Sequence, residues 1–319
     1  MFETPRLRKK SMTMISHTLR CLAAASLLAA PGLLEAQPAA HYVPGVEGIK
    51  GSSLPPPGLY FRDYNAFYIA GQVNDAAGNA AVLPSDFKAI VYANVPRLIW
   101  ITDAKVLGGN VGVDALLPLE YQSQRFSLTP GAHVPLYDHH SFGIGDFFAE
   151  GTLSWHPQQF DFAVGAGSWM PTGDSAKGPT TRAGLGYWTP MLTAGVTWYI
   201  DSDKTWAISA LSRYEINTKD RDTHDTVGQV YTMEWGVSKT LAKIFDVGAV
   251  GYYQQKVSRD TGNYPAYLSP YNRVAAVGPE VSVVIPSAKM FLSLRYEYEF
   301  MAESRAQGDT VCLTLTKAL

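Results

Sequence analysis

In Met290-Phe-Leu-Ser-Leu-Arg-Tyr-Glu-Tyr-Glu-Phe-Met301, two kinds of side chain alternate. One parity is apolar throughout, whereas the other carries three charged residues, Arg295, Glu297 and Glu299. A period of two residues predicts a β-strand, because a helix would bring its apolar positions together every three to four residues. A strand with one apolar face and one charged face suits a soluble sheet, and it equally suits a wall between lipid and a wet lumen.

Eleven further runs look like strands, which gives about twelve in all. They cover residues 60–71, 87–102, 111–121, 142–155, 160–171, 187–200, 205–217, 227–239, 244–257, 273–285 and 310–319. Most are long enough to cross a bilayer when tilted. Pro96 interrupts the second run, and we expect a bulge or bend there because proline removes one ladder hydrogen bond.

The connections between these runs alternate in length. Those after odd-numbered strands are long and polar, at 72–86, 122–141, 172–186, 218–226, 258–272 and 302–309, whereas most of the others are short. Outer-membrane barrels combine an even strand number with short periplasmic turns and long outer loops. Aromatic residues also gather near strand ends, as interfacial girdles do, at Trp100, Trp155, Trp188, Trp198, Tyr199 and Trp206. These features predict an all-β transmembrane antiparallel barrel over residues 59–319.

The first 36 residues read as a cleaved signal peptide. A basic N-terminal stretch precedes the mostly apolar run 21–34, and a small residue, Ala36, marks the cleavage site. Cleavage removes five basic and two acidic residues and leaves 21 basic and 26 acidic ones, a net charge of −5. An acidic chain gives no support to a nucleic-acid partner. Only Cys312 survives cleavage, so no intramolecular disulfide can form.

Composition favours a lipid-facing exterior. After the signal, no run of eighteen apolar residues is present, which argues against a helical membrane protein. Charged residues make up 17% of the chain, below the roughly 25% that is usual for a soluble domain. A secreted soluble β-protein is the alternative fold, and recovery of the protein without detergent would support it.

Residues 37–58 form a Pro- and Gly-rich segment with no periodicity, called the leader below. It could be an extended periplasmic stretch, or it could fold back into the barrel as a plug or hatch. The second interpretation rests on side chains that are more apolar than a free tail requires, above all Tyr42, Val43, Val46 and Ile49.

Charged residues whose parity turns them inward are the candidate permeation residues. They are Arg97, Asp114, Asp146, Glu150, Arg213, Glu215, Glu234, Glu280, Arg295, Glu297 and Glu299. Two interpretations stay open. The charges could pair with one another and allow a lumen wall to fold, or they could form a mixed-charge constriction that orients polar solutes.

The segment Asp138-His139-His140-Ser141 is the other place where chemistry is conceivable. A metal pair, a His/Ser catalytic pair of a lipid-modifying enzyme and a pH-sensitive loop are the specific interpretations. Solvent-facing histidines in an outer loop are the simpler one, because no third partner can be assigned. We therefore expect no catalytic residue, no metal site and no cofactor.

Short motifs along the mature chain resemble one family, the proteins called "MetA-pathway of phenol degradation". They include the Pro55-Pro56-Pro57-Gly58 run with Arg62-Asp63-Tyr64, then Trp155-His156-Pro157, Pro171-Thr172-Gly173-Asp174 and Gln307-Gly308-Asp309. The resemblance implies an outer-membrane β-barrel that helps hydrophobic substrates of aromatic catabolism to cross. In one respect the chain departs from outer-membrane barrels, since it ends on Leu319 where an aromatic residue is usual.

Together these observations predict a passive channel of the bacterial outer membrane for small hydrophobic or aromatic compounds. The expected partners are outer-membrane lipid, the transported solute and the barrel assembly machinery. Two other function classes remain open: an outer-membrane lipid-modifying enzyme, and a structural or adhesive barrel whose long loops bind an external partner.

Overall fold

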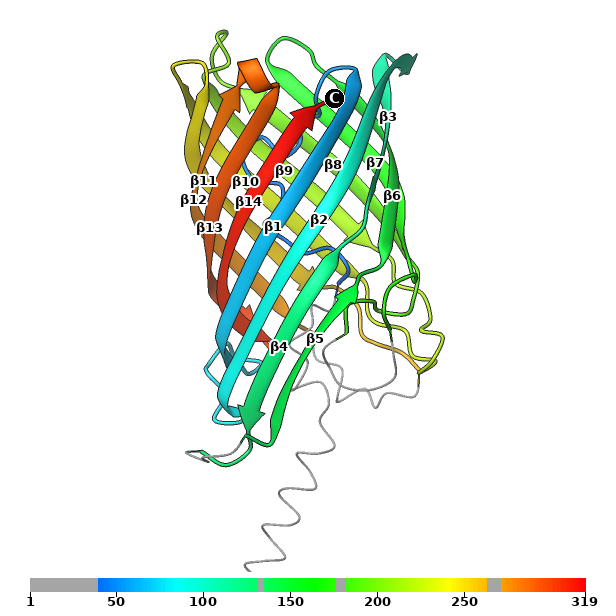
Figure 1. Ribbon diagram of the computed structural model, residues 1–319, viewed down its shortest axis with the longest axis vertical. Helices are drawn as coiled ribbons and strands as arrows, with labels where there is room; N and C mark the ends of the chain where they lie inside the picture. Colours follow the sequence, from blue (N-terminus) through cyan, green and yellow to red (C-terminus); the bar gives the residue numbers. More distant parts are fainter. Residues whose placement is uncertain (1–39, 131–134, 176–181, 263–270) are drawn as a thin grey trace, which may run out of the picture.

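The computed structural model describes residues 40–130, 135–175, 182–262 and 271–319, and these residues form a closed antiparallel β-barrel (Figure 1). The predicted signal peptide, 1–36, lies outside the described residues. No helix within the described part of the chain is long and apolar enough to cross a membrane.

Fourteen strand segments form one sheet. They are β1 (Gly58–Val73), β2 (Ser85–Val106), β3 (Gly109–Leu116), β4 (Leu119–Ser127), β5 (Tyr137–Ile144), β6 (Phe147–Trp155), β7 (Phe160–Met170), β8 (Thr189–Tyr199), β9 (Trp206–Glu215), β10 (Val230–Leu241), β11 (Phe245–Lys256), β12 (Arg273–Ile285), β13 (Met290–Glu303) and β14 (Ala306–Ala318), with a short 3-10 turn, η3 (Pro286–Ala288), between β12 and β13. The sheet closes because β1 pairs with both β14 and β2.

The barrel has twelve strand positions, as predicted, because two positions are each occupied by two segments. β3 and β4 both pair with the same edge of β2, from Arg97↔Leu116 to Asn94↔Leu119. β5 and β6 continue one another in the same way, since β4 pairs with β5 and β3 pairs with β6. The strand that was expected to begin at residue 142 therefore begins five residues earlier, at Tyr137.

Proline explains where the wall is interrupted. The β1–β2 register runs unbroken past Pro96, so the expected bulge is absent from that side. On the other side Pro96 faces the gap between β3 and β4, where its carbonyl accepts the amide of Leu117 at 3.2 Å. Pro118 occupies the same gap, and its carbonyl accepts the amide of Gly145 at 2.8 Å between β5 and β6. The interruption between β3 and β4 thus coincides with Pro96 and Pro118, which cannot donate ladder hydrogen bonds.

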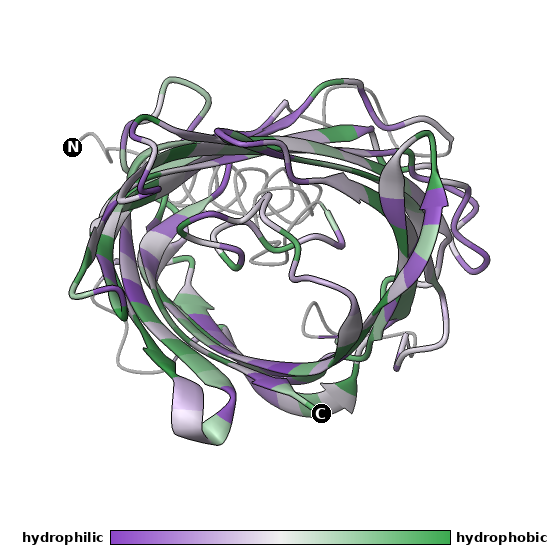
Figure 2. Cartoon of the chain, turned by 90° about the horizontal axis from the view of Figure 1, so that it is seen from above, coloured by the Kyte–Doolittle hydropathy of each residue, from purple (hydrophilic) through white to green (hydrophobic). Residues whose placement is uncertain are grey.

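Alternation along β13 separates lipid face from lumen face as the sequence predicts. Tyr298 and Phe300 are 48% and 56% exposed, whereas Arg295, Glu297 and Glu299 are at most 2% exposed. Figure 2 shows the barrel from one end, with the strands forming a ring around the lumen. The apolar exterior and the charged interior are those of a barrel in the outer membrane.

Two further expectations were wrong, one about a loop and one about an aromatic residue. Residues 302–309 do not form a long loop, because β13 and β14 extend toward each other and leave only Ser304 and Arg305 between them. Ser304 has a φ of +53°, as a tight hairpin turn requires. Of the predicted girdle, Tyr199 is buried and faces the lumen, whereas Trp100, Trp188, Trp198 and Trp206 are exposed.

The turns after β2, β6, β8, β10 and β12 lie with the C-terminus at one end of the barrel, which is the periplasmic end in this fold class (Figure 1). The turn between β8 and β9 is closed by Asp201, whose carboxylate accepts hydrogen bonds from Thr205 Oγ1 and Trp206 N, both at 2.7 Å. These hydrogen bonds to the charged form lower the pKa of Asp201 to about 2.

Candidate functional site

The described part of the leader, residues 40–57, runs inside the barrel (Figures 1 and 2). Near the periplasmic end, Ser53 Oγ lies 3.0 Å from Thr197 Oγ1 on β8, and Lys50 forms a 2.9 Å ion pair with Asp246 on β11. Toward the other end, His41 Nε2 lies 2.9 Å from Asp146. The segment is therefore attached to the wall along its length.

Wall carboxylates accept hydrogen bonds from the leader backbone. One oxygen of Glu215 accepts the amides of His41 and Tyr42 at 2.9 and 3.0 Å, and one oxygen of Glu234 accepts the amide of Gly45 at 2.8 Å. A segment without secondary structure needs such partners, because buried amides without them are costly. Two of the predicted lumen charges thus serve the leader directly.

A second attachment lies on β12 and β13. Glu280 accepts the amide of Ile49 at 2.9 Å, and Arg295 donates to the carbonyl of Gly45 at 3.0 Å. Arg295 Nε also lies 3.4 Å from Glu280. The pair therefore binds the leader through one donor and one acceptor.

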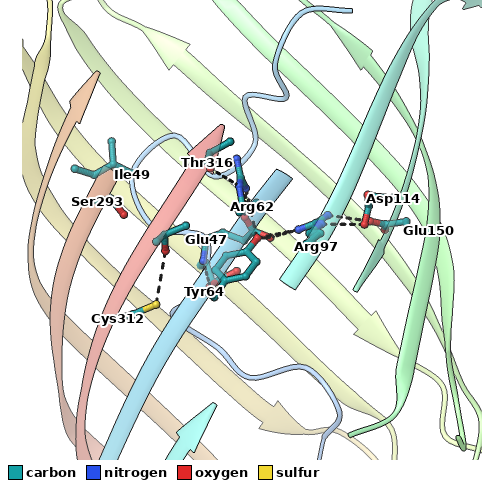
Figure 3. A network of polar contacts seen from close by, with 12 residues as sticks. Glu47, Ile49, Arg62, Tyr64, Arg97, Asp114, Glu150, Ser293, Cys312 and Thr316 are labelled. Atoms are coloured by element: carbon teal, nitrogen blue, oxygen red, sulfur yellow. Dashed lines mark hydrogen bonds and ion pairs between the residues drawn. The ribbon is translucent and has the colours of Figure 1, made fainter. Parts of the chain in front are cut away.

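Glu47 is the centre of the interior charge network (Figure 3). Its carboxylate pairs with Arg97 at 2.8 Å, Arg62 at 3.0 Å and Arg213 at 3.1 Å, and its side chain is 5% exposed. The three arginines come from β2, β1 and β9. One leader carboxylate therefore binds the guanidinium groups of three strands. β1 and β2 are neighbours in the barrel, whereas β9 is several strands away from both.

Two of these arginines have further partners on the wall. Arg97 pairs with Asp114 at 2.9 Å and approaches Glu150 at 4.0 Å (Figure 3). Arg213 pairs with Glu234 at 2.8 Å and lies 4.1 Å above the ring of Tyr42. Each guanidinium thus has carboxylates both on the wall and on the leader, as buried arginines require.

All eleven charged residues that parity turned inward are buried, each between 1% and 6% exposed. The contacts above bring together Arg97, Asp114, Glu150, Arg213 and Glu234 around the leader. Glu299 lies apart from them and accepts hydrogen bonds from Tyr68, Tyr252 and the amide of Gly308. Their part in permeation stays a prediction.

The four predicted hatch residues differ in placement. Tyr42 and Ile49 are buried at 6% and 7% exposure, and Tyr42 Oη donates to Glu234 at 2.5 Å. Val46 packs against the aromatic cluster around Trp169. Val43 is 40% exposed and faces open space inside the barrel. Three of the four thus fasten the leader, and the fourth lines the space beside it.

That open space consists of two cavities on one side of the leader. The outer one, of about 130 Å³, and the inner one, of about 70 Å³, share Val43, Ala66, Ala93, Pro118 and Glu120 in their walls. On this scale about 10–15 Å³ holds one water. Each cavity therefore has room for several waters, and the inner one extends to Glu47, Arg97 and Arg213.

Three residues of this site were not predicted from the sequence. Glu120 has the parity of Asp114, so continued alternation through Pro118 would have identified it. Arg62 lies on the lumen face of β1, where Asp63 and Asn65 obscured the alternation. Glu47 lies between Val46 and Ile49, two of the predicted hatch residues, but a segment without periodicity gives no signal for which side chain will be buried.

His139, His140 and Ser141 lie in β5 and not in an outer loop, which corrects that expectation. Because successive strand residues point to opposite faces, His139 and Ser141 share one face and His140 lies on the other. Across the described residues, no group of three His, Cys, Asp or Glu side chains is arranged to hold a metal ion.

The sequence profile of the family described as MetA-pathway of phenol degradation matches residues 70–315. Among solved structures, the COG4313 outer membrane channel from Pseudomonas putida F1 superposes with a TM-score of 0.73 over 87% of this chain and 100% of that chain, at 13% identity. This similarity shows the fold.

Two other solved barrels match more loosely. A FadL homologue of Pseudomonas aeruginosa has a TM-score of 0.39 at 9% identity, covering 85% of this chain and 92% of its own. The CymD monoaromatic hydrocarbon channel has a TM-score of 0.36 at 11% identity, covering 82% and 89%. A comparison with curated proteins gives no match.

Proposed function

The chain belongs to the MetA-pathway of phenol degradation family, and on that premise we propose that it is a passive outer-membrane channel for small hydrophobic or aromatic compounds. Such solutes would diffuse inward down a gradient that catabolism inside the cell maintains. The barrel supplies the lipid-facing wall, and the leader sets the width of the passage. No energy source is required for this mechanism.

The observation that carries the proposal is the pair of cavities beside the leader. Their shared wall is mostly apolar, with Val43, Ala66, Ala93, Pro118 and Trp169 beside the polar His41 and Glu120. A general porin has a wide polar lumen instead. A narrow apolar path favours small solutes that lose little hydration on entry.

We propose further that the leader acts as a fixed plug with a passage at its side, and not as a hatch that swings out. Its attachments involve Glu215, Glu234, Glu280, Arg295 and the three arginines around Glu47. Withdrawing the segment would break all of these contacts together, the buried ion pairs of Glu47 included. Small movements of side chains such as Val43 cost far less and suffice to widen the path.

Filling the shared wall tests this path. Ala93→Phe places a ring where both cavities meet, so we expect uptake of toluene or phenol to fall severalfold. The strand ladder is untouched, so folding into membranes should be retained. The measurement is uptake of radiolabelled solute by a bacterial host with an intact outer membrane that expresses the protein, compared with the same host without it.

Leu98→Phe is the matched control, because it adds a similar ring on the same strand but on the lipid-facing side, where Leu98 is 50% exposed. It should leave uptake unchanged. Equal uptake by the Ala93→Phe variant and the unmodified chain would show that solutes do not use the cavities. Equal uptake by hosts with and without the protein would contradict the channel itself.

A further inference from the structure

Glu120 differs from the other carboxylates that line the outer cavity. Asp146 accepts the amides of Gly173 and Leu185, both at 2.8 Å, in addition to its contact with His41. Glu299 has the three donors described above. Glu120, on β4, accepts one hydrogen bond, from Gln122 Nε2 to Oε2 at 2.8 Å, and forms no ion pair with any described residue.

The surroundings of Glu120 make its remaining oxygen a strong acceptor. The side chain lines both cavities, next to apolar wall residues that include Ala66, Ala93 and Pro118. A carboxyl group in such a setting is poorly hydrated, and a hydrogen bond to it gains strength as water is excluded. At the junction of the two cavities, Glu120 therefore offers an acceptor oxygen to the polar group of a passing solute.

We propose that Glu120 makes this junction a binding site for neutral one-ring solutes that carry a hydroxyl group. This inference rests on the proposed function and names the solute class more closely. The ring would lie against Ala66, Ala93, Pro118 and Val43, and the hydroxyl would donate its hydrogen to the Glu120 carboxylate. A plain hydrocarbon of the same shape would leave that acceptor without a partner, which costs affinity.

The charges along the path favour a neutral solute over an ion. An anion would meet the carboxylate of Glu120 at the junction. A cation would be held at Glu120 by charge attraction and would pass on slowly, because the inner cavity beyond it is lined by charges that already pair with one another, Arg97 and Arg213 with Glu47 and Glu150. A neutral hydroxyl donor avoids both the repulsion and the trapping and still gains one hydrogen bond.

The test is an equilibrium binding measurement with two probes of nearly equal shape, 4-fluorophenol and 4-fluorotoluene. Their dissociation constants are measured by fluorine NMR on the purified protein in lipid nanodiscs. We expect the unmodified protein to bind 4-fluorophenol more tightly. Glu120→Leu, which keeps the side-chain volume, should weaken 4-fluorophenol binding about tenfold or more and leave 4-fluorotoluene unchanged or tighter.

Two further variants separate the proposal from loss of structure. Glu120→Gln retains an acceptor oxygen and should give an intermediate value. Tyr121→Leu changes the neighbouring residue on the outside of the wall and should change neither constant. Equal binding of the two probes, or unchanged 4-fluorophenol binding by Glu120→Leu, would overturn the proposal. Because no transport is measured, failure here is distinct from a failed uptake test of Ala93→Phe.

Discussion

Glu47→Leu is expected to lower the free energy of unfolding of the barrel by about 3–5 kcal/mol, the range found when one partner of a buried ion pair is removed. The change leaves Arg62, Arg97 and Arg213 without the carboxylate that they share. Loss of that anchor should also loosen the leader and raise ion conductance. The stability is measured by urea unfolding of the protein refolded in lipid vesicles.

Glu303→Gln is the control for this result, because it removes an ion pair at the rim, where Arg273 is 44% exposed. Exposed pairs contribute little to stability, so the free energy of unfolding should hardly change. Glu47→Gln keeps the volume and one acceptor and should fall between the two. A Glu47→Leu protein as stable as the Glu303→Gln protein would mean that Glu47 does not anchor the leader.

Deleting residues 40–53 is expected to raise single-channel conductance severalfold in planar bilayers. The deletion spares every strand, and the barrel ladder closes through β1, β2 and β14 without the leader. Water would then fill the lumen and hydrate the carboxylates and arginines that the leader had satisfied. The channel should change from a narrow apolar passage into a wide polar pore.

The unmodified protein in the same bilayers sets the reference, and Ala93→Phe in the deleted background provides an internal check. One ring cannot block a wide lumen, so this added change should leave the raised conductance nearly intact. Equal conductance with and without residues 40–53 would show that the segment does not restrict the lumen.

The strands could be predicted from the sequence because lipid and lumen impose opposite demands on successive residues. In β13 the alternation of Tyr296, Tyr298 and Phe300 with Arg295, Glu297 and Glu299 is therefore complete enough to fix both the strand and its faces. The alternation of long and short connections then indicated an antiparallel barrel. The family resemblance, which the matching of residues 70–315 confirms, pointed to the same fold.

The interior could not be predicted in the same way, because it depends on contacts between distant residues. Glu47 meets Arg213, and Ile49 meets Glu280, across more than 160 and 230 positions of the chain, respectively. The inward parity of strand positions identified the charged residues of the barrel wall, but not the leader groups that they bind. Glu120 shares the parity of Asp114 within the predicted run 111–121, but parity alone does not show which inward side chain lines an open cavity.

We propose that solutes pass beside a leader that stays in place, and a cross-link between the leader and the wall is the experiment that decides it. A Cβ at position 236 would lie 3.3 Å from the Cα of Ile49, so Ile49→Cys with Gly236→Cys in a Cys312→Ala background ties the leader to β10. Uptake of radiolabelled toluene and phenol is then measured with the disulfide formed and after its reduction. We predict equal uptake in both states. Uptake that stops when the disulfide forms and returns on reduction would contradict the account, because it would mean that the leader must leave the lumen for solutes to pass.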